Sequence, residues 1–280
     1  MKISAIMPNF NHGEFISGAI NGVIGQSFQD LELIIVDDGS TDGSQEIISD
    51  FCGNDKRITP VFLEKNIGVT EAFNLGYSKS KGDLIIGCAS DDYLTELDFF
   101  KMAIQEIQRT DCGGAYAICE RIWDDGSHHS MIGCSPEQGI IGPVHFQKMF
   151  FMGKSFVPGF SAIWKRSCVD YLRGYPEELG PQHDYFINHA IPSIWGCCFI
   201  GRVVGKSRCY RDGRNYASRA TTEEKIQRHA RFEKKYRDYV SVDDEKLADE
   251  WRSKLIFDLC GGKDFEKWKE RYESFYKNLH

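Results

Sequence analysis

The sequence predicts an α/β protein built on a mostly parallel sheet with helices on both faces. Three observations support this class. The first hundred residues hold four short apolar, β-branched runs, separated by segments with helical spacing. The runs are hydrophobic throughout rather than alternating, as in strands that are buried on both faces. Each run ends in a polar cluster, so these clusters should meet at the carboxyl edge of the sheet, where such sheets bind ligands.

The elements of the first half follow in βαβαβαβ order. Strands are expected over residues 2–7, 31–36, 58–63 and 84–88, and helices over 15–24, 47–51 and 69–77. The polar clusters that end the strands are residues 8–11, 37–42, 65–68 and 90–92. A chain of 280 residues suffices for one large or two small domains with a substantial core.

The fourth strand ends in two adjacent carboxylates, Asp91 and Asp92. Adjacent carboxylates repel each other, and a hard divalent ion such as Mg²⁺ or Mn²⁺ relieves that repulsion. Because strand side chains alternate, one carboxylate can hold the metal while the other takes a ribose or supports the first. A second interpretation stays open, namely a polar strand-to-helix turn, since Thr95 and Glu96 follow.

Several function classes are excluded or disfavoured. No GxGxxG follows the first strand and no GxxxxGK[ST] occurs, so neither a dinucleotide site nor a P-loop is predicted. Carboxylates at the strand ends instead favour a nucleotide whose diphosphate is bound through a metal. The ten cysteines include no CxxC pair and no zinc-ligand spacing, and are expected to be small buried hydrophobes in a reducing cytosol.

Charge and hydropathy bear on partners and location. The net charge of −7 argues against general nucleic-acid binding. Residues 200–240 hold 12 Lys and Arg against five Asp and Glu, a local +7, which indicates either a solvated helix face or contact with phosphate or anionic lipid. The sequence enters a strand at once and has no run of 18 uncharged apolar residues, so a cytoplasmic protein, peripheral to the membrane at most, is expected.

The second half continues with a strand over 113–124, a hairpin turn at Asp125-Gly126, and surface histidines at 128 and 129. Residues 133–160 are expected to form a loop and a helix over the sheet edge, which could serve as an acceptor lid. A helix should start at 221–224, and two more follow on either side of Gly261-Gly262. Their aromatic stripes favour packing on the protein's own core; a homodimer or a membrane surface is the alternative.

One stretch carries a resemblance to a known family. Residues 7–44 read MPNFNHGEFISGAINGVIGQSFQDLELIIVDDGSTDGS, and NIGVTEAFNLGYSKSKGDLI and SDDYL follow. Together they resemble the catalytic domain of the family 2 glycosyltransferases, which has the GT-A fold, and the resemblance extends, weakening, to about Ser218. It implies a nucleotide-sugar-binding half over 1–100, an acceptor-binding half over 101–218, and a C-terminal helical extension over 219–280.

The resemblance also implies roles for residues of the donor half. Phe10 would stack on the base and Asp38 would accept a hydrogen bond from the uracil imide. Asn66 could reach the nucleotide, although a turn Asn before Gly68 explains it equally well. The family's metal motif usually reads Asp-x-Asp-Asp, and its first acidic position is Ala89 here. The remaining implied positions are Pro8 and Asp37, which would shape the base pocket, Asp91 near the ribose and metal, and Asp92 as principal ligand of Mn²⁺ or Mg²⁺.

In the acceptor half the same resemblance places the catalytic base at Asp184, after Gly174-Tyr175-Pro176-Glu177. An Asp that opens a helix lies at the positive end of the macrodipole, which favours its ionised form, although a simple helix cap would use it too. Its neighbour is His183, where the family more often has Glu. Arg211 could clamp the diphosphate or be a surface charge, and Gly213 stands where the family typically has His.

The function implied is an inverting glycosyltransferase that moves a sugar from a nucleotide-sugar donor, with UDP preferred, to an acceptor hydroxyl. The acceptor would be a saccharide or lipid-linked saccharide in surface polysaccharide or glycoconjugate synthesis. Ala89 and Gly213 motivate an alternative, a non-catalytic sugar-nucleotide-binding or scaffold protein. A nucleotidyltransferase would require a Gly-rich basic loop after the first strand, and the sequence has none there.

Overall fold

The computed structural model describes residues 1–133, 135, 139–154, 156–210 and 220–279. Within them a ten-stranded sheet runs in the order β3-β2-β1-β4-β9-β6-β10-β5, with β7 paired to β6 and β8 to β10. The strands are β1 (Ile3–Asn9), β2 (Leu31–Asp37), β3 (Ile58–Phe62), β4 (Leu84–Gly87), β5 (Tyr93–Leu94), β6 (Gly114–Trp123), β7 (His128–Ile132), β8 (Gly139–Ile141), β9 (Ala162–Lys165) and β10 (Cys197–Cys209).

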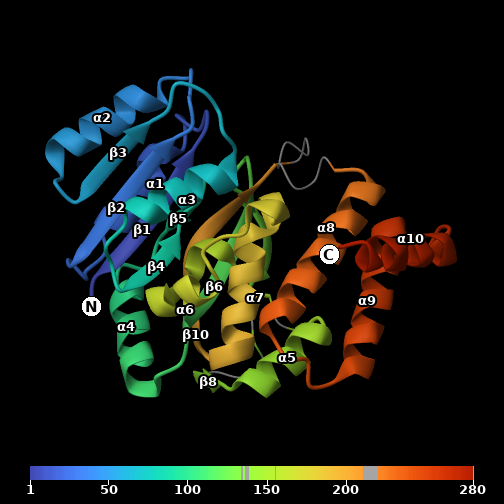
Figure 1. The fold of residues 1–280 in the computed structure, drawn as a ribbon. Helices are drawn as coiled ribbons and strands as arrows, with labels where there is room; N and C mark the ends of the chain where they lie inside the picture. The colour runs from blue at the N-terminus through green and yellow to red at the C-terminus, as the bar shows by residue number, and fades with distance from the viewer. Residues whose placement is uncertain (134, 136–138, 155, 211–219, 280) are drawn as a thin grey trace.

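Helices cover both faces of this sheet (Figure 1). They are α1 (Ile16–Ile24), α2 (Ser44–Asn54), α3 (Val69–Lys79), α4 (Phe99–Thr110), α5 (Pro143–Phe151), α6 (Arg166–Tyr171), α7 (His183–Trp195), α8 (Thr222–Tyr239), α9 (Glu245–Cys260) and α10 (Phe265–Lys277), with the 3₁₀ turns η1 (Gly159–Ser161) and η2 (Glu177–Gln182).

The first half has the predicted parallel topology. β1 pairs in parallel with β2 and β4, and β2 pairs in parallel with β3. The side chains of β1 alternate between two cores: Ala5 and Met7 pack on the face covered by α1, α2 and α4, while Ile6 packs on the opposite face. All four strand ends therefore lie at the same carboxyl edge, as the runs of apolar residues predicted.

The second half joins the same sheet through β9, which pairs antiparallel with β4 on one side and β6 on the other. The hairpin at Asp125-Gly126 is confirmed, because Gly126 has φ +82° and β7 returns antiparallel to β6. His128 and His129 are exposed, as expected. The long strand β10 was not predicted; its register against β6 shifts between Ile200 and Gly205, which breaks the apolar periodicity.

The C-terminal helices pack on one another and on the main body. Helix α8 begins in a capping box, where the Thr221 side chain and the Glu224 side chain each accept from the other's backbone N–H. Trp251 of α9 packs against Phe150, with ring centroids 5.4 Å apart, so this aromatic stripe lies on the protein's own core, as the favoured interpretation held.

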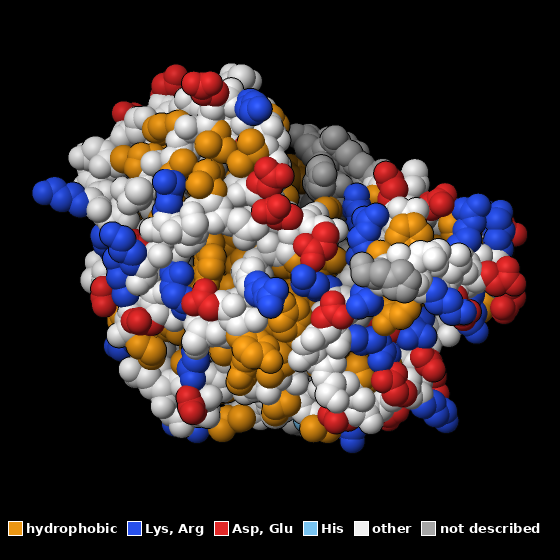
Figure 2. All heavy atoms as spheres, viewed as in Figure 1, with side chains coloured by type: hydrophobic (Ala, Val, Ile, Leu, Met, Phe, Trp, Pro, Cys, Tyr) orange, Lys and Arg blue, Asp and Glu red, His pale blue; other side chains and the backbone are white. Residues whose placement is uncertain are grey.

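A buried ionic cluster holds α8, α9 and α10 together. The Glu233 side chain is 4% exposed and accepts from Arg252 Nε at 2.7 Å, Tyr272 Oη at 2.7 Å and Arg237 Nε at 3.0 Å. These contacts lower the pKa of Glu233 although burial opposes the shift. Figure 2 shows Lys and Arg mixed with Asp and Glu over these helices. In the described part of the chain, every helix is too short or too polar to span a membrane.

Candidate active site

The end of β2 is organised by Asp37, which is fully buried. Its Oδ2 accepts from Asn9 Nδ2 at 2.7 Å, and its Oδ1 accepts from Ser40 N at 3.0 Å and Gln45 Nε2 at 2.8 Å. Asp37 thereby ties the ends of β1 and β2 to the start of α2. The role of Asp37 in shaping a base pocket stays a prediction, and its contacts with Ser40 and Gln45 were not predicted from the sequence.

Asp38 fixes the loop after β3. Its two oxygens accept from Ile67 N at 2.7 Å and Gly68 N at 2.9 Å, and the side chain is buried. The close approach of this loop requires glycine at position 39, where a Cβ would lie 2.9 Å from the backbone of Lys65. Each carboxylate oxygen keeps a further lone pair, so Asp38 can still accept from a ligand.

The side chain predicted to stack on the base, Phe10, and the one predicted to reach the nucleotide, Asn66, are both accessible at this edge. Phe10, directly after β1, is 44% exposed, and Asn66 in the loop held by Asp38 is exposed as well. Pro8 is half-buried and lies in β1 beside Val36 of β2. An exposed aromatic ring beside a buried carboxylate offers a stacking surface together with a hydrogen-bond acceptor.

Asp91 and Asp92 follow β4 and are held from β10. Tyr210 Oη donates to Asp91 Oδ2 at 3.1 Å, and the backbone N–H of Arg208 donates to Asp92 Oδ1 at 2.7 Å. Burial and the neighbouring charge of Asp91 raise the pKa of Asp92 well above its usual range, although the N–H of Arg208 opposes this. Ser90, just before the pair, lies 2.8 Å from His12 Nδ1.

These two carboxylates fit a divalent metal. Two adjacent carboxylates whose ionisation is unfavourable together are hard oxygen ligands that Mg²⁺ or Mn²⁺ would stabilise, with donor oxygens completing the coordination. Among the described residues there is no group of three or more His, Cys, Asp or Glu that could hold a metal by itself. The site therefore suits a metal shared with a diphosphate rather than a closed protein cage.

The sequence did not single out Arg208 of β10 or predict the contacts of Tyr210, the residue that follows this strand. The Arg208 guanidinium lies 4.2 Å from the centre of the Phe15 ring, and Tyr210 packs near the same ring at 6.3 Å. Only the pairing of β10 with β6 brings them to the carboxyl edge. Arg211 and Gly213, which the sequence did single out, lie outside the described residues.

Asp184 lies in the first turn of α7 and lines a separate pocket of about 320 Å³. Its Oδ1 accepts from the N–H of Tyr185 at 2.7 Å. Its Oδ2 faces Gly159, where an added Cβ would approach it to 2.6 Å. Other residues lining this pocket are Phe156, Pro181, Gln182, Asn188 and His229.

His183 does not share the environment of Asp184. It is buried, its Nδ1 donates to Gly180 O at 2.9 Å, and Thr70 Oγ1 lies 3.0 Å from the same nitrogen. The ring packs against both Phe73 and Tyr175, which also contact each other. His183 therefore joins α7 to α3.

The pocket of Asp184 includes a residue from the C-terminal extension. Among the described residues, the buried Nδ1 of His229 in α8 has no hydrogen-bond partner, and neither does the buried Oε1 of Gln182. The Nε2 atoms of these two residues lie 3.4 Å apart. Burial, followed by the charge of Arg228, lowers the pKa of His229 to about 4, so its ring is neutral at pH 7. No local pattern in the sequence predicts this contact.

Comparisons with known proteins show which family the chain resembles. The model of the family described as glycosyl transferase family 2 matches residues 4–172. An uncharacterized glycosyltransferase of Haemophilus influenzae is 38% identical over 120 residues, which cover 42% of this chain and 48% of the relative. TuaG of Bacillus subtilis, a glycosyltransferase named for teichuronic acid biosynthesis, is 37% identical over 90 residues, 32% of this chain and 36% of the relative. This chain thus matches about half or less of these relatives' length.

A solved structure, TarS 1-349 of S. aureus in complex with UDP, superposes with a TM-score of 0.70 and covers 95% of this chain and 74% of that one. At 16% identity this likeness shows the fold alone. It confirms the expected GT-A type α/β fold with a C-terminal helical extension, while the boundaries at residues 100 and 218 stay predictions. Because the family model matches more than half of the residues, the chain belongs to glycosyl transferase family 2.

Proposed function

We propose that the protein is an inverting glycosyltransferase that moves a sugar from a nucleotide-sugar donor, with UDP as the nucleotide, to an acceptor hydroxyl. The acceptor is a saccharide or a lipid-linked saccharide used in surface polysaccharide or glycoconjugate synthesis. Family membership, the TuaG relative and the fold shared with a UDP-bound TarS support this proposal. A lipid-linked acceptor would bring the enzyme to the cytoplasmic face of a membrane.

The donor half would bind the nucleotide at the carboxyl edge. Phe10 stacks on the base, Asp38 accepts the uracil imide N–H through a lone pair left free by its backbone contacts, and Asn66 contacts the nucleotide from the loop that Asp38 holds. Asp91 and Asp92 would hold Mn²⁺ or Mg²⁺. When bound, that ion stabilises the charge of the departing diphosphate, an effect of several kcal/mol.

The acceptor half would supply the base. Asp184 lies in the first turn of α7, and its Oδ2 faces Gly159, which also lines the pocket. It takes the proton of the acceptor hydroxyl while that oxygen attacks the anomeric carbon in line, so the configuration inverts. General-base assistance contributes about 10²–10⁴-fold. The observation that carries the proposal is this carboxylate in its own pocket, apart from the carboxylates that serve the donor.

The test is Asp184→Asn, which keeps the size and capping ability of the side chain but lacks its charge. UDP affinity should stay nearly unchanged while transfer falls about 10²-fold or more. Glu71→Gln is the matched control, because Glu71 is an exposed acid in the first turn of α3. A parental transfer rate in Asp184→Asn would place the base elsewhere, and loss of UDP binding would make Asp184 a donor ligand.

The alternative, a sugar-nucleotide-binding protein without activity, is distinguished by nucleotide release. Ala89 in place of the family's first acidic position motivates it. A panel of UDP-, GDP- and TDP-sugars is incubated with the protein, with and without Mn²⁺. The proposed enzyme releases the nucleotide from at least one donor, whereas a scaffold binds and releases none.

A further inference from the structure

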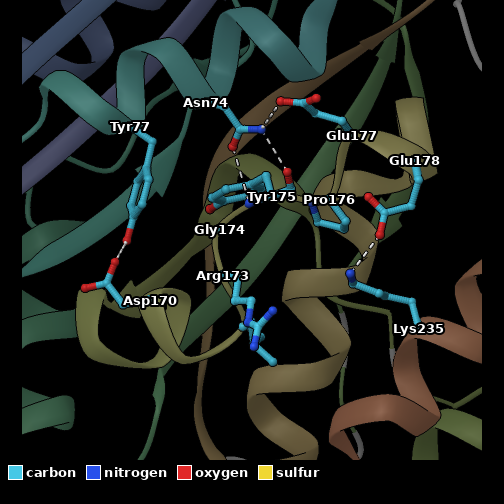
Figure 3. Close-up of a pocket in the computed structure, with 11 residues that line it drawn as sticks. Asn74, Tyr77, Asp170, Arg173, Gly174, Tyr175, Pro176, Glu177, Glu178 and Lys235 are labelled. Atoms are coloured by element: carbon cyan, nitrogen blue, oxygen red, sulfur yellow. Dashed lines mark hydrogen bonds and ion pairs between the residues drawn. The ribbon is translucent and has the colours of Figure 1, made fainter.

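A second cavity, of about 520 Å³, has no part in the site described so far (Figure 3). It lies among α3, α6, η2 and α8 and is larger than the pocket of Asp184. The side chains that define it are Asn74, Tyr77, Asp170, Arg173, Glu178 and Lys235.

The walls of this cavity are fixed by internal contacts. Asn74 Nδ2 donates to the carbonyl of Tyr175 at 2.8 Å, which holds the buried turn 174–176 in place. On one side Tyr77 Oη donates to Asp170 at 2.6 Å, and on the opposite side Lys235 lies 2.7 Å from Glu178 (Figure 3). The cavity is therefore formed before any ligand arrives.

Arg173 differs from the other charged residues of the cavity. It is exposed, and its guanidinium makes no hydrogen bond or ion pair with any residue that the structure describes. Its φ of +63° lies in the left-handed region, because Arg173 follows the end of α6 in a Schellman cap. In this cap the Arg173 N–H donates to Asp170 O at 2.9 Å and the Gly174 N–H donates to Val169 O at 3.0 Å, which fixes the backbone at the cavity rim. The unpaired guanidinium on this fixed backbone is a hydrogen-bond donor available to a ligand.

The charges of the cavity select the class of ligand. Three carboxylates, of Asp170, Glu177 and Glu178, face two cations, of Arg173 and Lys235, so an anionic ligand would be repelled. Hydroxyl groups both donate to carboxylates and accept from guanidinium and amide groups. The ring of Tyr77 adds apolar surface of the kind that packs against the C–H face of a sugar. These features match a neutral saccharide.

We propose that this cavity is a subsite for neutral sugar units of the acceptor chain, remote from the hydroxyl that is glycosylated. The inference rests on the proposed function and deepens it. The turn η2 connects the two places: Glu177 and Glu178 line this cavity, while Pro181 and Gln182 line the pocket of Asp184. Gly180, with φ +51°, puts a kink in η2 between these two pairs of residues, and the cavity and the pocket share no lining residue, so a ligand that reaches both has more than one sugar unit.

The decisive variant is Arg173→Gly. Glycine adopts a φ of +63° without strain, so the fold should be kept or stabilised while the guanidinium is lost. Asp264→Gly is the matched control, because exposed Asp264 also has a positive φ, of +53°, and lies at the start of α10, away from both cavities. The probes are neutral di- to hexasaccharides of glucose, galactose and N-acetylglucosamine, with inorganic phosphate as the anionic probe, in saturation-transfer NMR without donor.

The parent should bind at least one of these saccharides at millimolar concentration, and Arg173→Gly should weaken that binding about tenfold or more, as expected for a lost hydrogen bond to a charged group. Asp264→Gly should bind as the parent does, and Asp184→Asn should lose less affinity than Arg173→Gly. The proposal is overturned if the parent binds none of the saccharides, if phosphate competes with them, or if Arg173→Gly binds as tightly as the parent.

Kinetics separate this inference from the function on which it rests. Once an acceptor is known, Arg173→Gly should raise KM about tenfold for an oligosaccharide acceptor, leave kcat unchanged, and leave KM for a one-sugar acceptor unchanged. Equal effects on long and short acceptors would overturn the subsite. A parent that binds saccharides through Arg173 but transfers no sugar would refute the proposed function and leave the saccharide site standing.

Discussion

Tyr210 Oη lies 3.1 Å from Asp91 Oδ2, so the residue that directly follows β10 is hydrogen-bonded to the carboxylate pair that follows β4. The N–H of Arg208 holds Asp92 in the same way, at 2.7 Å. These contacts orient both carboxylates from the second half of the chain. The proposed metal site therefore depends on residues about 120 positions away in the sequence.

Replacing Asp92 by Ala should remove most of the metal-dependent affinity for UDP, because a single carboxylate would remain to hold the ion. Calorimetry with UDP, with and without Mn²⁺, measures this. Asp50→Ala, at an exposed position of α2, should bind UDP as the parent does. Equal Mn²⁺-dependent affinity in Asp92→Ala and the parent would remove Asp92 from the metal site.

Asp38→Ala should lose both stability and UDP affinity. Two backbone N–H groups, of Ile67 and Gly68, lose a charged acceptor, and each such bond contributes about 1.5–3 kcal/mol. Urea unfolding should show a loss of about 3 kcal/mol, and UDP should bind at least tenfold more weakly. If UDP binding is unchanged in Asp38→Ala, Asp38 only fixes the loop. If the parent prefers GDP or TDP to UDP, uracil is not the base that this site selects.

Gly159→Ala should impair transfer without weakening donor binding. The new Cβ would lie 2.6 Å from Asp184 Oδ2, so the carboxylate has to move, and a displaced base loses about 10²-fold in rate. Gly18→Ala serves as control, since nothing lies within 4 Å of a Cβ there. Initial rates and UDP affinities of both variants test the prediction, which an unimpaired Gly159→Ala enzyme would contradict.

His189 should make the fold sensitive to acid. It is fully buried, and burial lowers its pKa to about 4, although its hydrogen bond to the Tyr185 carbonyl opposes this. Between pH 6.5 and 4 the unfolded chain binds a proton that the folded chain excludes, so the free energy of unfolding falls on acidification, by about 3 kcal/mol in all. His189→Phe should show a loss about 2 kcal/mol smaller between pH 6.5 and 5 in urea unfolding. If the free energy of unfolding of His189→Phe depends on pH as the parent's does, His189 can be protonated in the folded protein.

Arg252→Ala should destabilise the C-terminal helices. Removing one partner of a buried charge costs about 3–5 kcal/mol, and Arg237 and Tyr272 would compensate Glu233 only in part. Lys246→Ala breaks an exposed ion pair with Glu250 on the same helix, α9, and should cost less than about 1 kcal/mol. Chemical denaturation of the two variants tests the difference, and equal losses would show that the buried cluster contributes no more than a surface pair.

The sequence predicted the first half well because its strands are uninterrupted apolar runs, each followed by polar residues at one sheet edge. The helix start at Thr221 and the break at Gly261-Gly262 were also local signals. β10 was missed since a register shift interrupts its pattern, and the antiparallel insertion of β9 between β4 and β6 follows from long-range pairing alone.

In the candidate site, too, the residue types were predicted from local signals and the long-range contacts were not. The carboxylates at positions 37, 38, 91 and 92 are visible as residue types at strand ends. Their partners come from distant segments: His12 meets Ser90 across 78 positions and Tyr210 meets Asp91 across 119. His229 reaches the pocket of Asp184 from a helix that the sequence placed in a separate extension. No local periodicity encodes such contacts.

The insertion of β9 between β4 and β6 has a mechanical consequence. Because β4 pairs with β9 and β5 pairs with β10, the two proposed halves of the chain share one sheet, and separating them would break both pairings. The described residues thus contain no hinge about which the two proposed halves could open and close as rigid bodies. In the proposed enzyme, donor entry and nucleotide release would then require motion of loops and side chains at the carboxyl edge. Mutations that change the mobility of these loops should therefore change the turnover rate.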